Sequence, residues 1–266
     1  MTAPAIECAA LTRRFDALTA VDALTLQVAD GEVFGLLGPN GAGKTTTIKM
    51  LITLLDPTSG GARVAGHDIV RDARAVRRSI GYVPQLLSSD GTLSARENLD
   101  ISTRLYHVPR GERRQRIDEA LEFMGLSEVG DKLVRTFSGG MIRRLEIAQA
   151  MLHRPAVLFL DEPTVGLDPV ARRAVWEHVR RLRERDGTTV MLTTHYMDEA
   201  AELCERLGIM HLGKLAALGT PAELAAQVGP GATLDAVFTH FTGSGLEEGG
   251  TFRDVARTRR TARRLG

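Results

Sequence analysis

Alternating apolar and polar positions mark the first strands of this chain. Residues 6–11 and 24–28 alternate or nearly alternate, which is typical of strands with one buried face. Residues 63–65 follow the turn at 56–61 and predict another strand, so we expect an antiparallel sheet at one edge of the fold. Residues 32–37 are apolar at almost every position and predict a buried strand.

Helical periodicity prevails between about residues 86 and 154. Within 113–124 the apolar positions recur every three or four residues, with charges on the opposite face. These positions are Ile117, Ala120, Leu121 and Met124. A short strand is predicted before this region at 80–83, and the continuous apolar run 156–160 after it suits a central parallel strand. We therefore predict a helical insertion into an α/β core.

Helices and strands alternate after the insertion. In order, we predict a helix at 169–185, a strand at 188–193, a helix at 197–206, a hairpin of strands 207–211 and 214–218, a helix start at Thr220, Pro221 and Glu223, and a helix at 233–241.

Length and composition fit one large α/β domain with an insertion, or two small domains. The chain has 266 residues, of which 43% are apolar and 25% charged, and its net charge of +1 excludes a general binder of polyanions. Cys8 and Cys204 lie far apart without metal-ligand spacing, which favours a reducing cytoplasm. The start of the chain predicts no signal peptide, and no apolar run approaches the roughly 20 residues of a membrane span. Any membrane role is expected to come through a partner.

The C-terminal end has a different composition. Residues 243–250 are rich in glycine and acids and predict a linker, whereas 251–266 hold six arginines against the single acid Asp254. We expect this tail to be mobile. A solvated end, anionic lipid headgroups or nucleic acid would each suit its charge.

The segment GPNGAGKT at residues 38–45 carries the strongest chemical signal. It fits G-x-x-x-x-G-K-[ST], the loop that wraps nucleotide phosphates, and lies between strand 32–37 and a helix predicted over 46–54. Glycines let backbone N–H groups point at phosphate oxygens, and the helix start adds its positive dipole end. Lys44 can reach the β- and γ-phosphates, and Thr45 can bind Mg²⁺. The predicted nucleotide-binding residues here are Gly38, Pro39, Asn40, Gly41, Ala42, Gly43, Lys44, Thr45 and Thr46.

Asp161 and Glu162 directly follow the apolar run 156–160. In open α/β sheets the carboxyl ends of the strands face the ligand. Asp161 can therefore hold the Mg²⁺ of a bound nucleotide, and Glu162 can orient or deprotonate a water that attacks the γ-phosphate. An exposed acidic strand end is the ordinary alternative, and the phosphate loop favours the catalytic interpretation.

Residues 137–141, FSGGM, precede a helix predicted over 143–152. Ser138 is a favourable N-cap residue, and Gly139 and Gly140 leave backbone N–H groups unobstructed, so this helix start is a second candidate anion site. An ordinary capped helix is the alternative. A single chain gains little from a second phosphate site so far from the first, whereas two copies arranged head to tail could each supply one.

In combination, these motifs resemble the ATP-binding subunits of ATP-binding-cassette (ABC) transporters. The resemblance covers roughly residues 5–242 and rests on motifs that occur in the family's order. They are 38–45, 138–141, 158–162, 166–168 and His195. The resemblance implies an α/β P-loop NTPase core with an antiparallel β edge sheet and a helical subdomain inserted at about 86–154. It also implies a head-to-tail homodimer that sandwiches two ATP molecules, each between 38–45 of one copy and 138–140 of the other.

The resemblance assigns roles to further residues. Phe15 lies where the family usually has an aromatic that stacks on adenine, although a core phenylalanine is the alternative. Gln85 corresponds to the glutamine that touches Mg²⁺ and the attacking water and couples to the membrane subunit. Asp168 corresponds to the aspartate that crosses the dimer, and His195 to the switch histidine that contacts the γ-phosphate. The implied catalytic residues are Glu162, His195 and Lys44, and the implied metal ligands are Thr45, Gln85 and Asp161.

The segment 137–141 departs from the family's commonest signature, Leu-Ser-Gly-Gly-Gln, at both ends. The serine and both glycines are kept, so phosphate binding is expected to survive. The methionine with the basic pair Arg143 and Arg144 looks like the branch of daunorubicin-resistance-type and nodulation-type exporters, as do 80–85 and 234–243. This implies export, with separate permease subunits.

The resemblance therefore predicts an ATPase on the cytoplasmic face of the membrane that uses ATP and Mg²⁺. It would power an exporter of a drug, antibiotic or lipid-like substrate, whose identity the permease sets. A soluble ABC ATPase acting on nucleic acid or ribosomes is the alternative. Such proteins usually carry tandem cassettes or long insertions, which this sequence lacks, so no nucleic-acid partner is expected.

Overall fold

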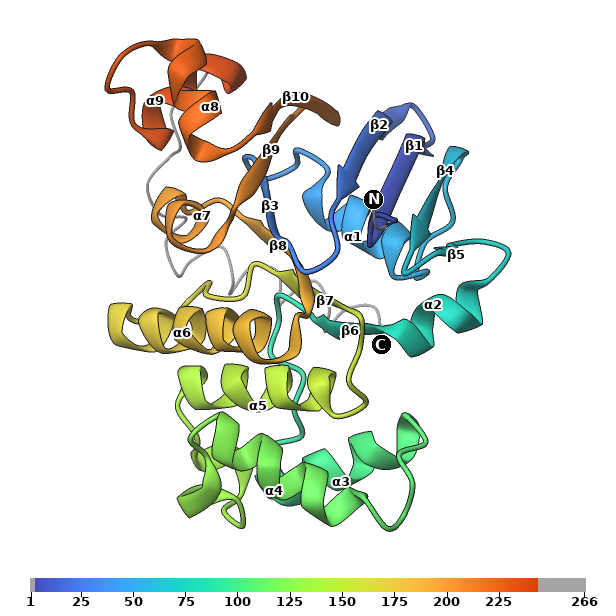
Figure 1. Cartoon of the computed structure of the whole chain (residues 1–266), viewed down its shortest axis with the longest axis vertical. Coiled ribbons are helices and arrows are strands. Elements are labelled where there is room, and N and C mark those ends of the chain that lie inside the picture. The colour runs from blue at the N-terminus through green and yellow to red at the C-terminus, as the bar shows by residue number, and fades with distance from the viewer. Residues whose placement is uncertain (1–2, 244–266) are drawn as a thin grey trace.

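The computed structural model describes residues 3–243; the arginine-rich tail and nearly all of the expected linker lie outside this range. Its centre is a six-stranded sheet with the order β10-β9-β3-β8-β7-β6 (Figure 1). The strands are β3 (Val33–Leu37), β6 (Ile80–Val83), β7 (Val157–Asp161), β8 (Thr189–Thr194), β9 (Arg206–His211) and β10 (Lys214–Gly219). All neighbours are parallel except β9 and β10, which form the predicted hairpin.

A second, antiparallel sheet has the order β2-β1-β4-β5 and lies beside helix α1 in Figure 1. Its strands are β1 (Ile6–Phe15), β2 (Leu18–Val28), β4 (Ser59–Val64) and β5 (His67–Asp68). The predicted edge sheet is thus confirmed. Its first two strands are longer than predicted because they continue into a hairpin in which Phe15 pairs with Leu18.

Helices cover both faces of the core sheet. They are α1 (Lys44–Leu51), α2 (Ala73–Ser79), α6 (Pro169–Asp186), α7 (Met197–Leu203), α8 (Pro221–Val228) and α9 (Leu234–Thr242). Helix α8 begins with the predicted capping box, in which Thr220 and Glu223 each bond the other's backbone N–H. Within residues 3–243, no helix has the length and apolarity needed to cross a membrane.

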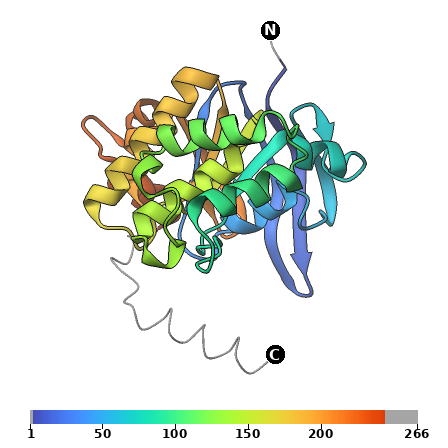
Figure 2. The same cartoon turned by 90° about the horizontal axis from the view of Figure 1, so that it is seen from below.

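The chain between β6 and β7 is mostly helical. It contains α3 (Ala95–Leu105), α4 (Arg113–Phe123), two 3₁₀ turns (Ser127–Val129 and Val134–Thr136) and α5 (Gly139–Met151). Helix α5 contacts α3 and α4 on one side and α6 on the other. These helices therefore extend the molecule away from the sheet, as Figure 1 shows, and they lie in front of the sheet in Figure 2.

The buried residues form two clusters, one on each face of the core sheet. In β7, Leu158 and Leu160 belong to the cluster under the helical side, whereas Val157 and Phe159 belong to the cluster shared with the antiparallel sheet. Burial on both faces explains why β7 has a continuous apolar run instead of alternation.

Tertiary contacts shift some predicted boundaries. The helix predicted at 197–206 ends at Leu203, because the N–H of Glu205 donates to the Val33 carbonyl at 2.9 Å and Arg206 then pairs with Phe34 in the sheet. The helix predicted over 46–54 is α1, which begins two residues earlier and ends at Leu51. Helix α2 was not predicted, since Val76 is its one buried residue and gives no apolar period.

Candidate nucleotide-binding and hydrolysis site

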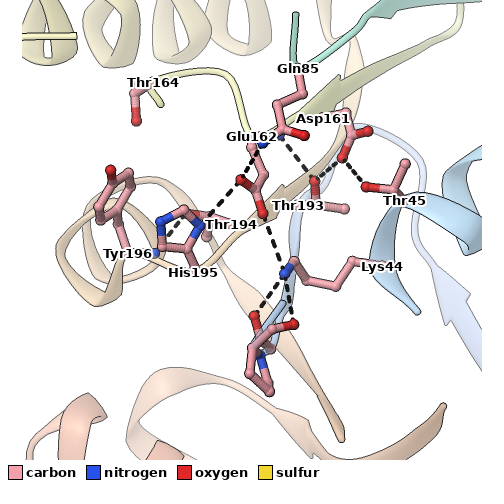
Figure 3. Close-up of polar contacts among 12 residues, drawn as sticks. Lys44, Thr45, Gln85, Asp161, Glu162, Thr164, Thr193, Thr194, His195 and Tyr196 are labelled. Carbon is pink, nitrogen blue, oxygen red and sulfur yellow. Dashed lines mark hydrogen bonds and ion pairs between the residues drawn. The ribbon is translucent and has the colours of Figure 1, made fainter. Parts of the chain in front are cut away.

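Four adjacent parallel strands deliver the central residues of the predicted site to one edge of the core sheet. Strand β3 leads into the phosphate loop, β6 leads toward Gln85, β7 ends at Asp161 with Glu162 next, and β8 is followed by His195. The carboxyl ends of parallel strands share an edge, which is where ligands bind in open α/β sheets. Figure 3 shows these side chains converging.

The phosphate loop depends on close backbone packing at Gly43. This residue has φ 103°, and a Cβ placed on it would come within 2.3 Å of the Ala20 carbonyl oxygen, so no other residue fits without a shift. Gly43 is also the N-cap of α1, where no side chain caps the helix. The first N–H groups of α1 therefore suit an anionic ligand.

The ammonium group of Lys44 lies within the phosphate loop and binds its backbone. Its Nζ donates to the carbonyl oxygens of Gly38 at 2.7 Å and Pro39 at 3.2 Å, and lies 3.3 Å from Oε1 of Glu162. Burial lowers the pKa of Lys44, although the nearby carboxylates favour the charged form. Phosphate oxygens bound in the loop would meet this buried cation directly.

Glu162 is the centre of the polar contacts in Figure 3. Its Oε1 faces Lys44, while its Oε2 accepts a hydrogen bond from Nε2 of Gln85 at 3.1 Å and lies 3.2 Å from Nδ1 of His195. Burial opposes its charge, yet His195 and Lys44 outweigh burial, and the pKa of Glu162 is lowered. An ionised carboxylate with these partners can orient a water or accept its proton.

The backbone at Glu162 is strained. Its φ of 47° lies in the left-handed region, which is uncommon for a residue other than glycine. Its N–H donates to both the carbonyl oxygen of Thr193, at 3.1 Å, and the hydroxyl of Thr193, at 3.0 Å. Strain of this kind is concentrated at functional sites.

Asp161 and Thr45 offer oxygen ligands to a cation. Oδ1 of Asp161 accepts hydrogen bonds from the hydroxyls of Thr45, at 3.0 Å, and Thr193, at 2.6 Å. Burial raises the pKa of Asp161 in spite of these bonds, so a neighbouring cation would relieve the cost of burying its charge. Carboxylate, hydroxyl and amide oxygens suit Mg²⁺. The residues present, with Gln85 close by, therefore fit a magnesium ion.

The second predicted anion site lies at the start of α5. The Ser138 hydroxyl accepts from the N–H of Met141 at 3.3 Å, and both Ser138 and Gly139 are exposed. A Cβ on Gly140 would come within 2.7 Å of the Cβ of Ala171 in α6, so this glycine allows the two helix starts to pack closely. Among residues 3–243, no hydrogen bond joins Ser138 to the phosphate loop.

Asp168 caps the neighbouring helix α6. Its Oδ1 accepts from the N–H groups of Val170 and Ala171, both at 2.9 Å, and the residue is exposed. The structure thus brings one group of predicted residues together at the sheet edge. It places Ser138, Gly139, Gly140 and Asp168 in a second group.

A family model described as ABC transporter matches residues 21–165, which is more than half of the chain. The chain belongs to the ABC transporter family. It is the ATP-binding component, and members of this family hydrolyse ATP to power transport. The predicted fold class and the predicted ATPase activity are both confirmed.

Characterised relatives of this ABC ATPase are similar over most of its length. Daunorubicin resistance ATP-binding protein DrrA3 of Streptomyces coeruleorubidus is 48% identical over 82% of this chain and 68% of its own. Nod factor export ATP-binding protein I of Paraburkholderia xenovorans (strain LB400) is 44% identical over 85% of this chain and 74% of its own. A solved structure of an ATP-binding subunit of an ABC transporter aligns with a TM-score of 0.79 and 30% identity, covering 89% of this chain and 98% of that one.

Phe15 of the ABC ATPase lies at the end of β1, in the hairpin that leads into β2. Its side chain is 40% exposed, and the guanidinium of Arg13 lies 4.5 Å from the ring centroid. The alternative of a core phenylalanine is therefore wrong. The ring is available for stacking.

Sequence reasoning missed the role of Thr193. Its hydroxyl bonds the carboxylate of Asp161 and the N–H of Glu162, so it fixes both acidic residues. The feature that would have revealed this role is the parallel pairing of β7 with β8, in which Asp161 lies opposite Thr193. That pairing depends on strand order, which the sequence does not contain.

Proposed function

We propose that this ABC ATPase powers a membrane exporter as a head-to-tail homodimer bound to separate permease subunits on the cytoplasmic face. We also propose that residues 5–242 form one ATP-binding domain with its helical insertion at about 86–154. The observation that carries the proposal is the division of the predicted site into two groups that share no hydrogen bond within residues 3–243. One surrounds Lys44 and Glu162, and the other is the exposed helix start at Ser138.

A second copy of the chain would bring one residue group of each protomer against the other group of its partner. In a head-to-tail pair, the γ-phosphate held by Lys44 in one protomer would meet the N–H groups at the start of α5 in its partner. Asp168 lies beside that helix start and would reach the same interface. Each nucleotide would then bind both halves, so ATP binding would close the dimer.

The residues of the first group have distinct roles in hydrolysis. Lys44 binds and neutralises the phosphates, and Glu162 orients or deprotonates the attacking water. Gln85 and His195 hold the carboxylate of Glu162 in place through their contacts with Oε2. Thr45 and Asp161 would hold Mg²⁺, which neutralises charge on the phosphate oxygens.

An exposed apolar pair next to Gln85 is a candidate contact for the permease. Leu86 is 77% exposed and Leu87 is 49% exposed, immediately after the residue that bonds Glu162. The names of the relatives, daunorubicin resistance and Nod factor export, support a drug, antibiotic or lipid-like cargo. No named relative supports the nucleic-acid alternative.

Co-purification from membranes tests the proposal. A tagged wild-type chain is expected to bring down a protein with many membrane-spanning helices, and the variant Leu86→Asp/Leu87→Asp is expected to lose it while still binding ATP. Leu212→Asp is the matched control, because Leu212 in the β9–β10 hairpin is also 77% exposed. Salt-sensitive pelleting with ribosomes or DNA in place of a membrane protein would reject the exporter.

A further inference from the structure

A buried ion pair on helix α5 binds the backbone of the segment that carries Gln85. Arg143 donates through Nη1 to the Pro84 carbonyl at 2.6 Å and through Nη2 to the Gln85 carbonyl at 2.8 Å. It also pairs with Oε2 of Glu146 at 3.0 Å. One guanidinium thus fixes two consecutive carbonyl groups and a carboxylate, a geometry that depends on its rigid planar fork.

Glu146 binds the next part of the same segment. Its Oε1 accepts from the N–H and hydroxyl of Ser88 and, at 3.3 Å, from the N–H of Ser89. One turn further along α5, Gln149 accepts from the Ser89 hydroxyl at 2.8 Å. Three side chains on one face of α5, spaced by three residues, therefore hold the segment 84–89. Arg143 and Glu146 bond its backbone, and Gln149 bonds the side chain of Ser89.

Burial of the Arg143–Glu146 ion pair costs desolvation free energy. The side chains of Arg143 and Glu146 are 1% and 2% exposed. Burial lowers the pKa of Arg143 and raises the pKa of Glu146, each against the attraction of the other. Buried ion pairs are often no more stabilising than apolar residues of the same volume. The distinctive property of this pair is the geometry that it specifies.

The pair lies between the two groups of the predicted site. Arg143 lies in the second turn of α5, whose first residue follows Ser138. At the other end, the amide of Gln85 donates to Glu162. A continuous polar path therefore runs from Glu162 through Gln85 and Arg143 into the helix whose start is the second anion site.

We propose that Arg143 and Glu146 are positioning residues that make the segment 84–89 and helix α5 move as one body. The amide of Gln85 at one nucleotide and the start of α5 at the other would then be placed together. This inference rests on the proposed dimer, because only there do both ends act on nucleotide. Loss of the pair is expected to weaken ATP-driven closure and turnover while the phosphate loop still binds ATP.

The substitution Arg143→Lys tests the inference in the full-length chain. Lysine keeps the charge opposite Glu146 but lacks the fork that binds two carbonyls. Arg144→Lys is the matched control, because the neighbouring Arg144 donates to the Met124 carbonyl instead. Both changes are made in the Glu162→Gln background, where hydrolysis is expected to be slow, and dimer mass is followed by light scattering against Mg-ATP concentration.

We expect Arg143→Lys to need roughly 10- to 100-fold more ATP for dimerisation than Arg144→Lys, as a misplacement of about 1 Å would cause. Binding of a fluorescent ATP analogue by the loop is expected to change by less than about twofold. A merely structural role would instead lower the unfolding temperature, loop binding and dimerisation together. The double variant Arg143→Met/Glu146→Leu, which replaces the pair with apolar residues, is expected to behave like Arg143→Lys.

Turnover measured with the native Glu162 in place distinguishes failure of the proposed dimer from failure of the positioning role of Arg143 and Glu146. If Glu162→Gln alone stays monomeric with Mg-ATP, the proposed dimer is wrong and the inference that rests on it fails as well. If Glu162→Gln dimerises, turnover tests the role of the pair separately. Arg143→Lys is expected to lower kcat relative to Arg144→Lys with little change in KM. Equal dimerisation and equal kcat for the two lysine variants would overturn the inference.

Discussion

Replacing Glu162 with glutamine removes one charge from the centre of the site and leaves its shape nearly unchanged. The carboxylate faces Lys44 at 3.3 Å and His195 at 3.2 Å. At an effective dielectric constant near 20, the ion pair with Lys44 is worth on the order of 5 kcal/mol before desolvation is subtracted. The carbonyl oxygen of the glutamine can still accept a hydrogen bond from Lys44, whereas its NH2 group takes the place of the oxygen that accepts from Gln85. The loop around Lys44 is therefore expected to stay intact.

The larger effect falls on hydrolysis. General-base catalysis contributes roughly 10²- to 10⁴-fold, which corresponds to about 3–5 kcal/mol of the activation barrier. We expect kcat to fall by this factor in a steady-state phosphate-release assay. Binding of ATP is expected to persist or strengthen, because Lys44 no longer has a competing carboxylate charge.

The exposed Glu122, on α4, supplies the control. Glu122→Gln makes the same chemical change and is expected to leave both kcat and ATP affinity unchanged. If Glu162→Gln turned over within about threefold of the wild type, the general-base contribution would be absent. The role given to Glu162 would then be wrong.

Further predictions concern three groups of the same site. Lys44→Ala removes charge-assisted bonds worth about 1.5–3 kcal/mol, so calorimetry should show ATP affinity lower by roughly 10- to 100-fold. Asp161→Asn keeps an acceptor oxygen for the hydroxyls of Thr45 and Thr193. The free energy of unfolding, measured by urea denaturation, should therefore change by less than about 1 kcal/mol, whereas Mg²⁺-dependent turnover should be lost. The lowered pKa of Glu162 means that its stabilising contribution is present above the unfolded value of 4.5 and is lost as the pH falls through the lower folded value. The free energy of unfolding, measured by urea denaturation at several pH values through this acidic range, should fall in the wild type and should fall less in Glu162→Gln.

Local pattern predicted the elements that bury apolar residues. The run 156–160 and the alternation in 24–28 identified β7 and part of β2, because burial on two faces or on one face leaves a direct trace in the sequence. Helix α2 left no such trace, since one buried residue sets no period. The end of α7 at Leu203 was set by the pairing of β9 with β3, which is a tertiary contact.

Motif spacing predicted which residues carry the chemistry but not how they are held. The structure joins Lys44, Gln85 and His195 through Glu162, as expected if their strands end at one sheet edge. Arg143 shows the limit of such reasoning. In the sequence, Arg143 and Arg144 were interpreted together as one basic pair. In the structure, Arg143 is buried against Glu146 and backbone carbonyls, whereas Arg144 donates to a different carbonyl, that of Met124. Helix orientation decides this difference, and the sequence alone does not give it.

Cross-linking between protomers tests the head-to-tail site most directly. In the Glu162→Gln background, Asn40→Cys in the exposed part of the phosphate loop is combined with Ser138→Cys at the start of α5. Background from Cys8 and Cys204 is expected to be low, because both are buried and burial raises the pKa of both thiols, that of Cys8 to about 12.

With Mg-ATP and a short thiol-reactive cross-linker, the double variant is expected to give a covalent dimer, whereas each single variant stays monomeric. A double variant that binds ATP and still gives no covalent dimer would contradict the account.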